Sequence, residues 1–140
     1  MSDEVQLTAD GERALEEAQR YCGRMNVAII GPEHLLAGAL LVLGQAGLSN
    51  LPAPEALEAA LMASQGSGTE PLAANMMFGS AAREAINFTA GGVRGAGGTN
   101  ITAFAIAAGT IASGEVGPMF FGALGTTREA LLAALTAGLA

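Results

Sequence analysis

The chain has 140 residues, and 51% of them are apolar although only 4% are aromatic. A core with so few rings must be built from aliphatic and small side chains, which favours closely packed helices in one domain. Thirteen acidic residues face six arginines and no lysine, and the net charge of −7 argues against nucleic-acid binding because it repels phosphates.

The sequence also carries signals about its compartment. The single cysteine, Cys22, excludes an internal disulfide and suits a reducing cytoplasm. The residues from Met1 to Glu4 are acidic where a secretory signal needs a basic region. The longest apolar run, 101–112, falls well short of the roughly 20 residues of a membrane-spanning helix. We therefore expect a soluble, cytoplasmic protein.

Three helices are predicted in the first half of the chain. Thr8 can cap the first helix, and its apolar residues recur at helical spacing: Ala14, Leu15, Ala18, Cys22 and Met25. Pro32 suits the first position of a second helix because proline has no N–H to satisfy there, and Glu33 suits the positive helix end. Pro54 begins a third helix, which ends near Gln65.

The second half repeats this plan after a Gly/Ser-rich linker at about 65–73. Helices are predicted from about 79 to 90, from 102 to 113 and from 126 to 137. Thr126 with Glu129 three residues later forms a capping box for the last of them. The glycine-rich segment 91–98 holds a helix poorly, so we expect a mobile loop there.

The two halves align as an internal duplication. Residues 7–40 match 78–111 at a constant offset of 71, and 55–61 match 129–135 at an offset of 74. A duplication of this kind usually means one helical unit that buries its apolar face against its copy. We place repeat one at about 7–64 and repeat two at about 74–138, and we expect an all-α domain that presents a surface.

Several residues then point to a family. The pairs Leu7-Thr8 and Ala14-Leu15, followed by the run from Ile30 to Gly38 with Glu33-His34 inside it, resemble the Clp N-terminal domain of Clp-type AAA+ unfoldases. Leu7 stands where that family usually has Phe, and Pro32 where it has Thr. Repeat two loses the Glu-His pair, which becomes Phe104-Ala105.

The resemblance implies a pseudo-twofold helical bundle of two repeats, each with three to four helices. It also implies a non-enzymatic module, without cofactor, that docks substrate or adaptor proteins or modulates a Clp ATPase or its peptidase. A chain without lysine cannot carry the phosphate-binding loop of an ATPase. Whether the chain stands alone or is one domain of a longer protein stays open. The alternative is a diverged structural or oligomeric domain that keeps the fold and binds a different partner.

Some members of the family bind phosphoarginine through a Thr and a Glu in each repeat, with helix-end N–H groups meeting the phosphate. The resemblance carries these roles to Thr8 and Glu33 in repeat one. In repeat two the positions hold Gly79 and Phe104, so at most one such site is expected. The alternative is that Thr8 and Glu33 only cap and charge helix N-termini.

Two short clusters of Met and Phe are candidates for an apolar partner-binding patch, because such side chains adapt to varied surfaces. They comprise Met76, Met77 and Phe78, and Met119, Phe120 and Phe121. Ordinary core packing between the repeats is the alternative. The one histidine, His34, rules out a two-His metal motif. A catalytic Cys22/His34 pair lacks an orienting carboxylate, so no catalytic residue and no metal site are predicted.

Overall fold

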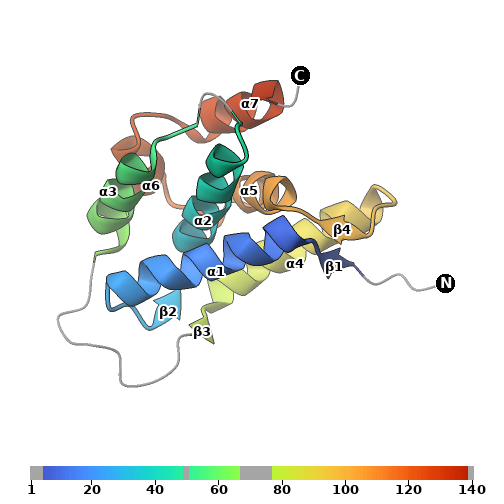
Figure 1. The fold of residues 1–140 in the computed structure, drawn as a ribbon, viewed down its shortest axis with the longest axis horizontal. Helices are drawn as coiled ribbons and strands as arrows, with labels where there is room; N and C mark the ends of the chain where they lie inside the picture. Colours follow the sequence, from blue (N-terminus) through green and yellow to red (C-terminus); the bar gives the residue numbers. More distant parts are fainter. Residues whose placement is uncertain (1–4, 49–50, 67–76, 139–140) are drawn as a thin grey trace.

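The computed structural model describes residues 5–48, 51–66 and 77–138. Within these ranges the chain forms seven helices and four two-residue strands (Figure 1). In chain order they are β1 (Gln6–Leu7), α1 (Ala9–Arg24), β2 (Ile29–Ile30), α2 (Pro32–Gln45), α3 (Pro54–Gln65), β3 (Met77–Phe78), α4 (Ser80–Gly95), β4 (Asn100–Ile101), α5 (Ala103–Ala112), α6 (Pro118–Ala123) and α7 (Arg128–Gly138). The all-α prediction is confirmed, and the short strands add to it.

The elements follow the register of the duplication. Helices α1 and α4 have the same length and begin 71 residues apart, as do β1 and β3, β2 and β4, and α2 and α5. Helices α3 and α7 begin 74 residues apart. The first turns explain this agreement: Thr8 caps α1, Pro32 and Pro54 occupy first helical positions, and Thr102 caps α5.

The short strands join the two repeats reciprocally. Strand β1 of repeat one pairs in parallel with β4 of repeat two, and β2 of repeat one pairs with β3 of repeat two. The β1/β4 pair lies at one end of α1 and the β2/β3 pair at the other end (Figure 1). The repeats are therefore related by a pseudo-twofold axis, and each end of the molecule contains backbone from both of them.

Helix α2 is the centre of the core. Nearly all of its residues are buried, and it packs against α1, α3 and α5. Glycines bring the crossing helices together in both repeats. A Cβ added to Gly38 would meet the Ala14 carbonyl oxygen at 2.4 Å, and one added to Gly109 would meet the Thr89 side chain at 2.1 Å. Small residues at these crossings allow the close approach that an Ala-rich core needs.

Three local expectations were wrong. The last helix is capped by Thr127, whose hydroxyl oxygen accepts from the Ala130 N–H at 3.1 Å, and not by Thr126. Helix α4 continues to Gly95, through most of the segment predicted to be a loop. Each helical glycine costs up to about 1 kcal/mol relative to alanine, but Val93 packs against the core and holds the last turn in place. Residues 118–123 form helix α6, which was anticipated only as an apolar cluster. Most of the predicted linker lies outside the described residues.

Candidate functional site

Thr8 follows β1 directly and caps α1. Its hydroxyl oxygen accepts from the Gly11 N–H at 3.2 Å, and its O–H lies within reach of the Asp10 carboxylate and of the Ile101 carbonyl. Its own N–H donates to the same Ile101 carbonyl at 3.1 Å. Thr8 thus contacts the strand that leads into α5 of repeat two.

Glu33 lies in the first turn of α2 and is only 7% exposed. Its carboxylate oxygen Oε2 accepts from the backbone N–H of Gly117 at 2.9 Å. Gly117 is the N-cap of α6, so the carboxylate lies at the N-terminal ends of two helices, where their dipoles favour negative charge. Glu33 therefore ties repeat one to α6 of repeat two.

The structure does not bring Thr8 and Glu33 together. Thr8 precedes α1, whereas Glu33 follows β2 at the far end of that helix, and 16 helical residues span about 24 Å. The neighbour of Glu33 in space is the other strand pair, where the Gly79 N–H donates to the Ile30 carbonyl at 2.9 Å. Because the strands of one repeat pair with those of the other, Thr8 lies beside Ile101 of repeat two and Glu33 beside Gly117 of repeat two. A single ligand therefore cannot contact both Thr8 and Glu33.

His34 and Cys22 are both buried and lie in different surroundings. The Nδ1 atom of His34 accepts from the Gly31 N–H at 3.0 Å, and burial lowers the pKa of His34 to about 4. Burial raises the pKa of Cys22 to about 12, so at neutral pH its sulfur stays a thiol and is a poor nucleophile. Among the described residues no group of three or more His, Cys, Asp or Glu side chains could hold a metal ion.

The Met and Phe clusters divide between surface and core. Met77 and Met119 are 66% and 64% exposed, whereas Phe120 and Phe121 are buried and pack edge to face. Phe78 is partly buried against the core, and Met76 lies outside the described residues. Phe120 and Phe121 are not available as a patch, because α6 places them inside the core. Among the described members of the two clusters, Met77 and Met119 remain exposed.

An apolar hollow that the sequence motifs did not reveal lies between α4 and α5. This α4/α5 groove has a volume of about 210 Å³ and is lined by Phe88, Thr89, Gly92, Val93, Ala105 and Gly109. The Phe88 side chain is 51% exposed at its rim. Thr89 does not add an unpaired donor, because its hydroxyl donates to the Ala85 carbonyl at 2.8 Å.

The duplication explains why the α4/α5 groove exists. At the offset of 71, Gly92 takes the place of Tyr21, a ring that is 2% exposed in repeat one. Phe88 takes the place of Glu17, and Ala105 takes the place of His34. Repeat two has therefore lost a buried ring and gained an exposed one, which leaves an apolar surface open to solvent. A position-by-position comparison of the two repeats in the sequence would have been enough to find this change.

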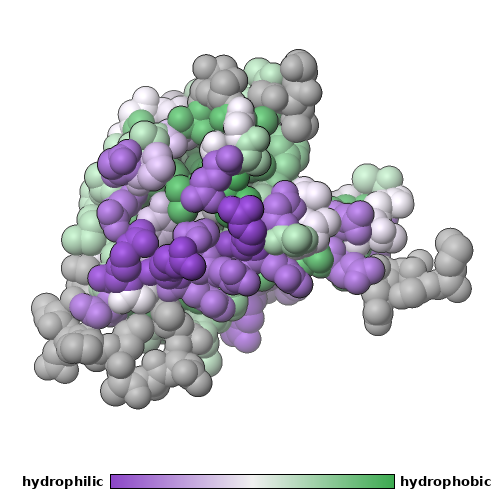
Figure 2. Space-filling view, in the orientation of Figure 1, coloured by the Kyte–Doolittle hydropathy of each residue, from purple (hydrophilic) through white to green (hydrophobic). Residues whose placement is uncertain are grey.

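The surface over α1 differs from the rest of the face shown in Figure 2. Hydrophilic side chains gather over α1, whereas hydrophobic surface is concentrated above it, toward α2 and α7 (Figure 2).

No helix in the described part of the chain is both long enough and apolar enough to cross a membrane.

The sequence matches no family model and no curated protein. Among solved structures, the fold is similar to the N-terminal domain of the caseinolytic protease associated chaperone ClpD from Arabidopsis thaliana. The TM-score is 0.73 over 95% of this chain and 94% of that one, with 18% sequence identity. The predicted fold is thereby confirmed: the chain has the fold of a Clp N-terminal domain.

Proposed function

We propose that this chain is a non-enzymatic, cytoplasmic protein-binding module of the Clp chaperone and protease system. It docks substrate or adaptor proteins, or modulates a Clp ATPase. The fold supports the first part of this proposal, since a protein described as a protease-associated chaperone has the same fold in its N-terminal domain. The α4/α5 groove supports the second part and is the observation on which the proposal rests.

The groove has the properties of a site for an apolar side chain from another protein. Its walls are formed by apolar side chains and glycine backbone, and its volume suits one aromatic or large aliphatic group. In repeat one the position that corresponds to Gly92 holds Tyr21, whose ring is buried. An incoming side chain would also cover part of Phe88, and burying apolar area contributes roughly 25 cal/mol per Å².

The test fills the groove with a side chain of the protein itself. A Cβ at Gly92 meets nothing within 4 Å, so Gly92→Tyr restores the ring of repeat one without a backbone clash. The probe is fluorescein-labelled, reduced and carboxymethylated α-lactalbumin, a permanently unfolded protein, and binding is followed by anisotropy. We expect Gly92→Tyr to weaken binding roughly tenfold.

Gly91→Tyr is the matched control for this test. A Cβ at Gly91 is equally free of contacts, but Gly91 does not line the groove. We expect it to bind the unfolded probe within about a factor of two of wild type. Equal affinities for wild type and Gly92→Tyr, or a loss of binding in Gly91→Tyr as well, would remove the groove from the proposal.

A phosphoarginine-type site would have to rely on Glu33 without Thr8. The Glu33 carboxylate and the N-terminal N–H groups of α2 have the required chemistry, but the carboxylate is buried and already accepts from Gly117. We therefore expect at most one weak site. Calorimetric titration of phosphoarginine against wild type and Glu33→Gln tests it, and equal heats in the two proteins would exclude it.

A second candidate function, self-association, is favoured by the β2/β3 end of the molecule. Ile29 and Met77 pair in register there and are 58% and 66% exposed. At the β1/β4 end the corresponding register pair is polar, Gln6 with Asn100. The double variant Ile29→Asn/Met77→Gln copies that polar pair. A wild-type dimer that this variant returns to monomers in sedimentation would favour the structural alternative, and a monomeric wild type would exclude it.

A further inference from the structure

An exposed carboxylate lies beside the α4/α5 groove. Glu84 precedes Phe88 by four residues in α4, and residues at this spacing are neighbours on one face of a helix. Both side chains are exposed, and Phe88 is part of the groove wall. Among the described residues no ion pair involves the Glu84 carboxylate. The groove therefore has an aromatic ring and an unpaired negative charge side by side at its edge.

The two arginines of α4 lie on the opposite face of that helix. At about 100° per residue, Arg83 and Arg94 are roughly 150° to 170° around the helix from the centre of the groove-lining positions. Helix α5 forms the other wall and has no charged residue between Ala103 and Ala112. The negative charge of Glu84 is therefore not balanced at the groove by a basic side chain from either of these helices.

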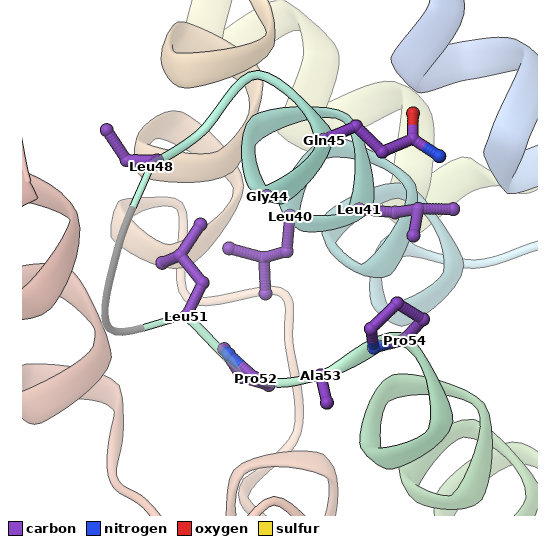
Figure 3. A pocket seen from close by; sticks show the side chains of 9 residues that line it. All are labelled: Leu40, Leu41, Gly44, Gln45, Leu48, Leu51, Pro52, Ala53 and Pro54. Carbon is purple, nitrogen blue, oxygen red and sulfur yellow. The ribbon is translucent and has the colours of Figure 1, made fainter.

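Repeat one satisfies the same position within its own chain. At the offset of 71 the counterpart of Glu84 is Arg13, which donates from Nη2 to the side-chain oxygen of Gln45 at 2.8 Å. Gln45 extends from the end of α2 beside a hollow of about 300 Å³, whose lining also includes Gly44 (Figure 3). The counterpart of Gln45 in repeat two is Val116, which is buried and has no polar side-chain atom. Repeat two thus has no equivalent partner for Glu84.

The neighbouring position has changed in the same direction. Glu17 is the counterpart of Phe88, and its carboxylate pairs with Arg20 at 2.9 Å. In repeat two Gly91 stands in the place of Arg20. Repeat one therefore pairs its charged groups internally, whereas repeat two presents an exposed ring and an exposed carboxylate one turn apart. Because the chain also carries a net charge of −7, a segment with an apolar and a basic side chain complements this surface better than an acidic one.

The geometry of α4 sets the spacing of these two side chains in a partner. Glu84 and Phe88 are four residues apart, which is about 6 Å along the axis of a helix. In an extended segment, side chains two residues apart lie on the same side and are separated by about 6.6 Å. An apolar side chain and a basic side chain at this spacing can therefore reach Phe88 and Glu84 together.

We infer that the α4/α5 groove binds an extended segment of a partner protein in which a large apolar side chain and an arginine or lysine lie two residues apart. The apolar side chain enters the groove against Phe88, and the cation pairs with Glu84. This inference rests on the proposed function, because it names the class of segment that the same groove selects. The selectivity is electrostatic and the pair is exposed, so it weakens as the salt concentration rises.

The probes are three synthetic peptides. The first has the sequence Gly-Arg-Ser-Phe-Ser-Arg-Gly, with an arginine two residues to each side of the phenylalanine. The second has glutamate in place of both arginines, and the third has serine in place of the phenylalanine. Binding to the full chain is followed by the backbone amide shifts of Gly92 and Gly109 in ¹⁵N-labelled protein, which detect weak complexes. We expect the arginine peptide to bind about fivefold more tightly than the glutamate peptide, and the serine peptide to leave both amides unshifted.

Two variants with the same net charge separate the local contact from the charge of the whole chain. Glu84→Gln removes the carboxylate beside the groove, whereas Glu129→Gln removes one from the first turn of α7, which does not line it. We expect Glu84→Gln to bind the arginine peptide about threefold more weakly and Glu129→Gln to bind it like wild type. Glu84→Arg copies the residue of repeat one and should reverse the preference in favour of the glutamate peptide.

Three outcomes would overturn the inference. The first is the absence of a shift at Gly92 and Gly109 with the arginine peptide. The second is equal binding of the arginine and glutamate peptides, which would leave the groove as an apolar site without charge selection. The third is an equal effect of Glu84→Gln and Glu129→Gln, which would assign the preference to the overall charge. Failure of the proposed function is a different result, because there Gly92→Tyr leaves binding of the unfolded protein unchanged.

Discussion

The two repeats share one arrangement of helices and strands but differ in how completely side chains fill the space between their helices. In repeat one, Tyr21, His34 and the tie from Glu33 make a closely packed unit around α1 and α2. In repeat two, Gly92 and Ala105 leave the α4/α5 groove, whereas Arg128 covers the last carbonyl groups of α5. Each repeat therefore lacks a feature that the other has. Duplication allows this, because a stable partner repeat can compensate for an unfilled position in its copy, and the unfilled position becomes available for binding.

Alanine substitutions of the glycines at the helix crossings should give the largest difference in stability loss between the repeats. A Cβ at Gly38 would lie 2.4 Å from the Ala14 carbonyl oxygen and 2.8 Å from the Ala18 nitrogen, and both are backbone atoms that cannot move aside. At Gly109 the contacts begin with the Thr89 side chain. We expect Gly38→Ala to lower the free energy of unfolding by about 3 kcal/mol or to prevent folding, and Gly109→Ala to cost less. Urea denaturation checks this, and equal losses would contradict the asymmetry.

Acid should destabilise the protein through His34, which has no counterpart in repeat two. Its pKa is lowered from 6.5 to about 4 by burial, so the unfolded chain takes up a proton first as the pH falls. The contribution of the neutral ring is complete above pH 6.5 and is lost between 6.5 and about 4, a change of about 3 kcal/mol.

His34→Gln separates this effect from general acid denaturation. Glutamine can accept from the Gly31 N–H in the same capping position and does not titrate. Urea unfolding at pH 7 and pH 4.5 should show a smaller loss of stability in His34→Gln than in wild type. Parallel losses in the two proteins would mean that His34 does not control the acid response.

The hydrogen bond from the Gly117 N–H to the Glu33 carboxylate, which joins the two repeats, should contribute an intermediate amount to the free energy of unfolding. Glu33→Ala leaves the Gly117 N–H without its acceptor and removes a negative charge from the start of two helices, which should cost about 2 kcal/mol. Glu33→Gln keeps an acceptor and should cost about half as much. Thermal unfolding of the three proteins orders them, and an unchanged stability in Glu33→Ala would show that the bond does not hold α6 in place.

The smallest effect should be a gain of stability in α4. Gly91 and Gly92 lie in the helix without contacts at their Cβ positions, so alanine at either should raise the free energy of unfolding by up to about 1 kcal/mol. Hydrogen exchange of the last turn of α4 measures this locally. Faster exchange in both variants would mean that the glycine backbone is needed for the fold.

The sequence predicted the local elements well because their signals are local. Thr8 and Pro32 each begin a helix where their chemistry favours one, and the constant offset of 71 recurs in the helix boundaries. The candidate sites were harder to predict. Thr8 and Glu33 were assigned to one pocket because they belong to one repeat, but strand exchange sets them at opposite ends of α1. Phe120 and Phe121 could not be assigned to surface or core until α6 was known to place them inside.

By itself the sequence determined a duplicated, helical chain with a small-residue core and the register of its two halves, since capping, periodicity and repetition act over a few residues. The tertiary structure decided which residues meet across the pseudo-twofold axis. It also decided that α4 continues through its glycines and that hollows remain beside Gly92 and Gly44. Those outcomes depend on packing between segments about 70 residues apart, where the free energy of burial outweighs local preference.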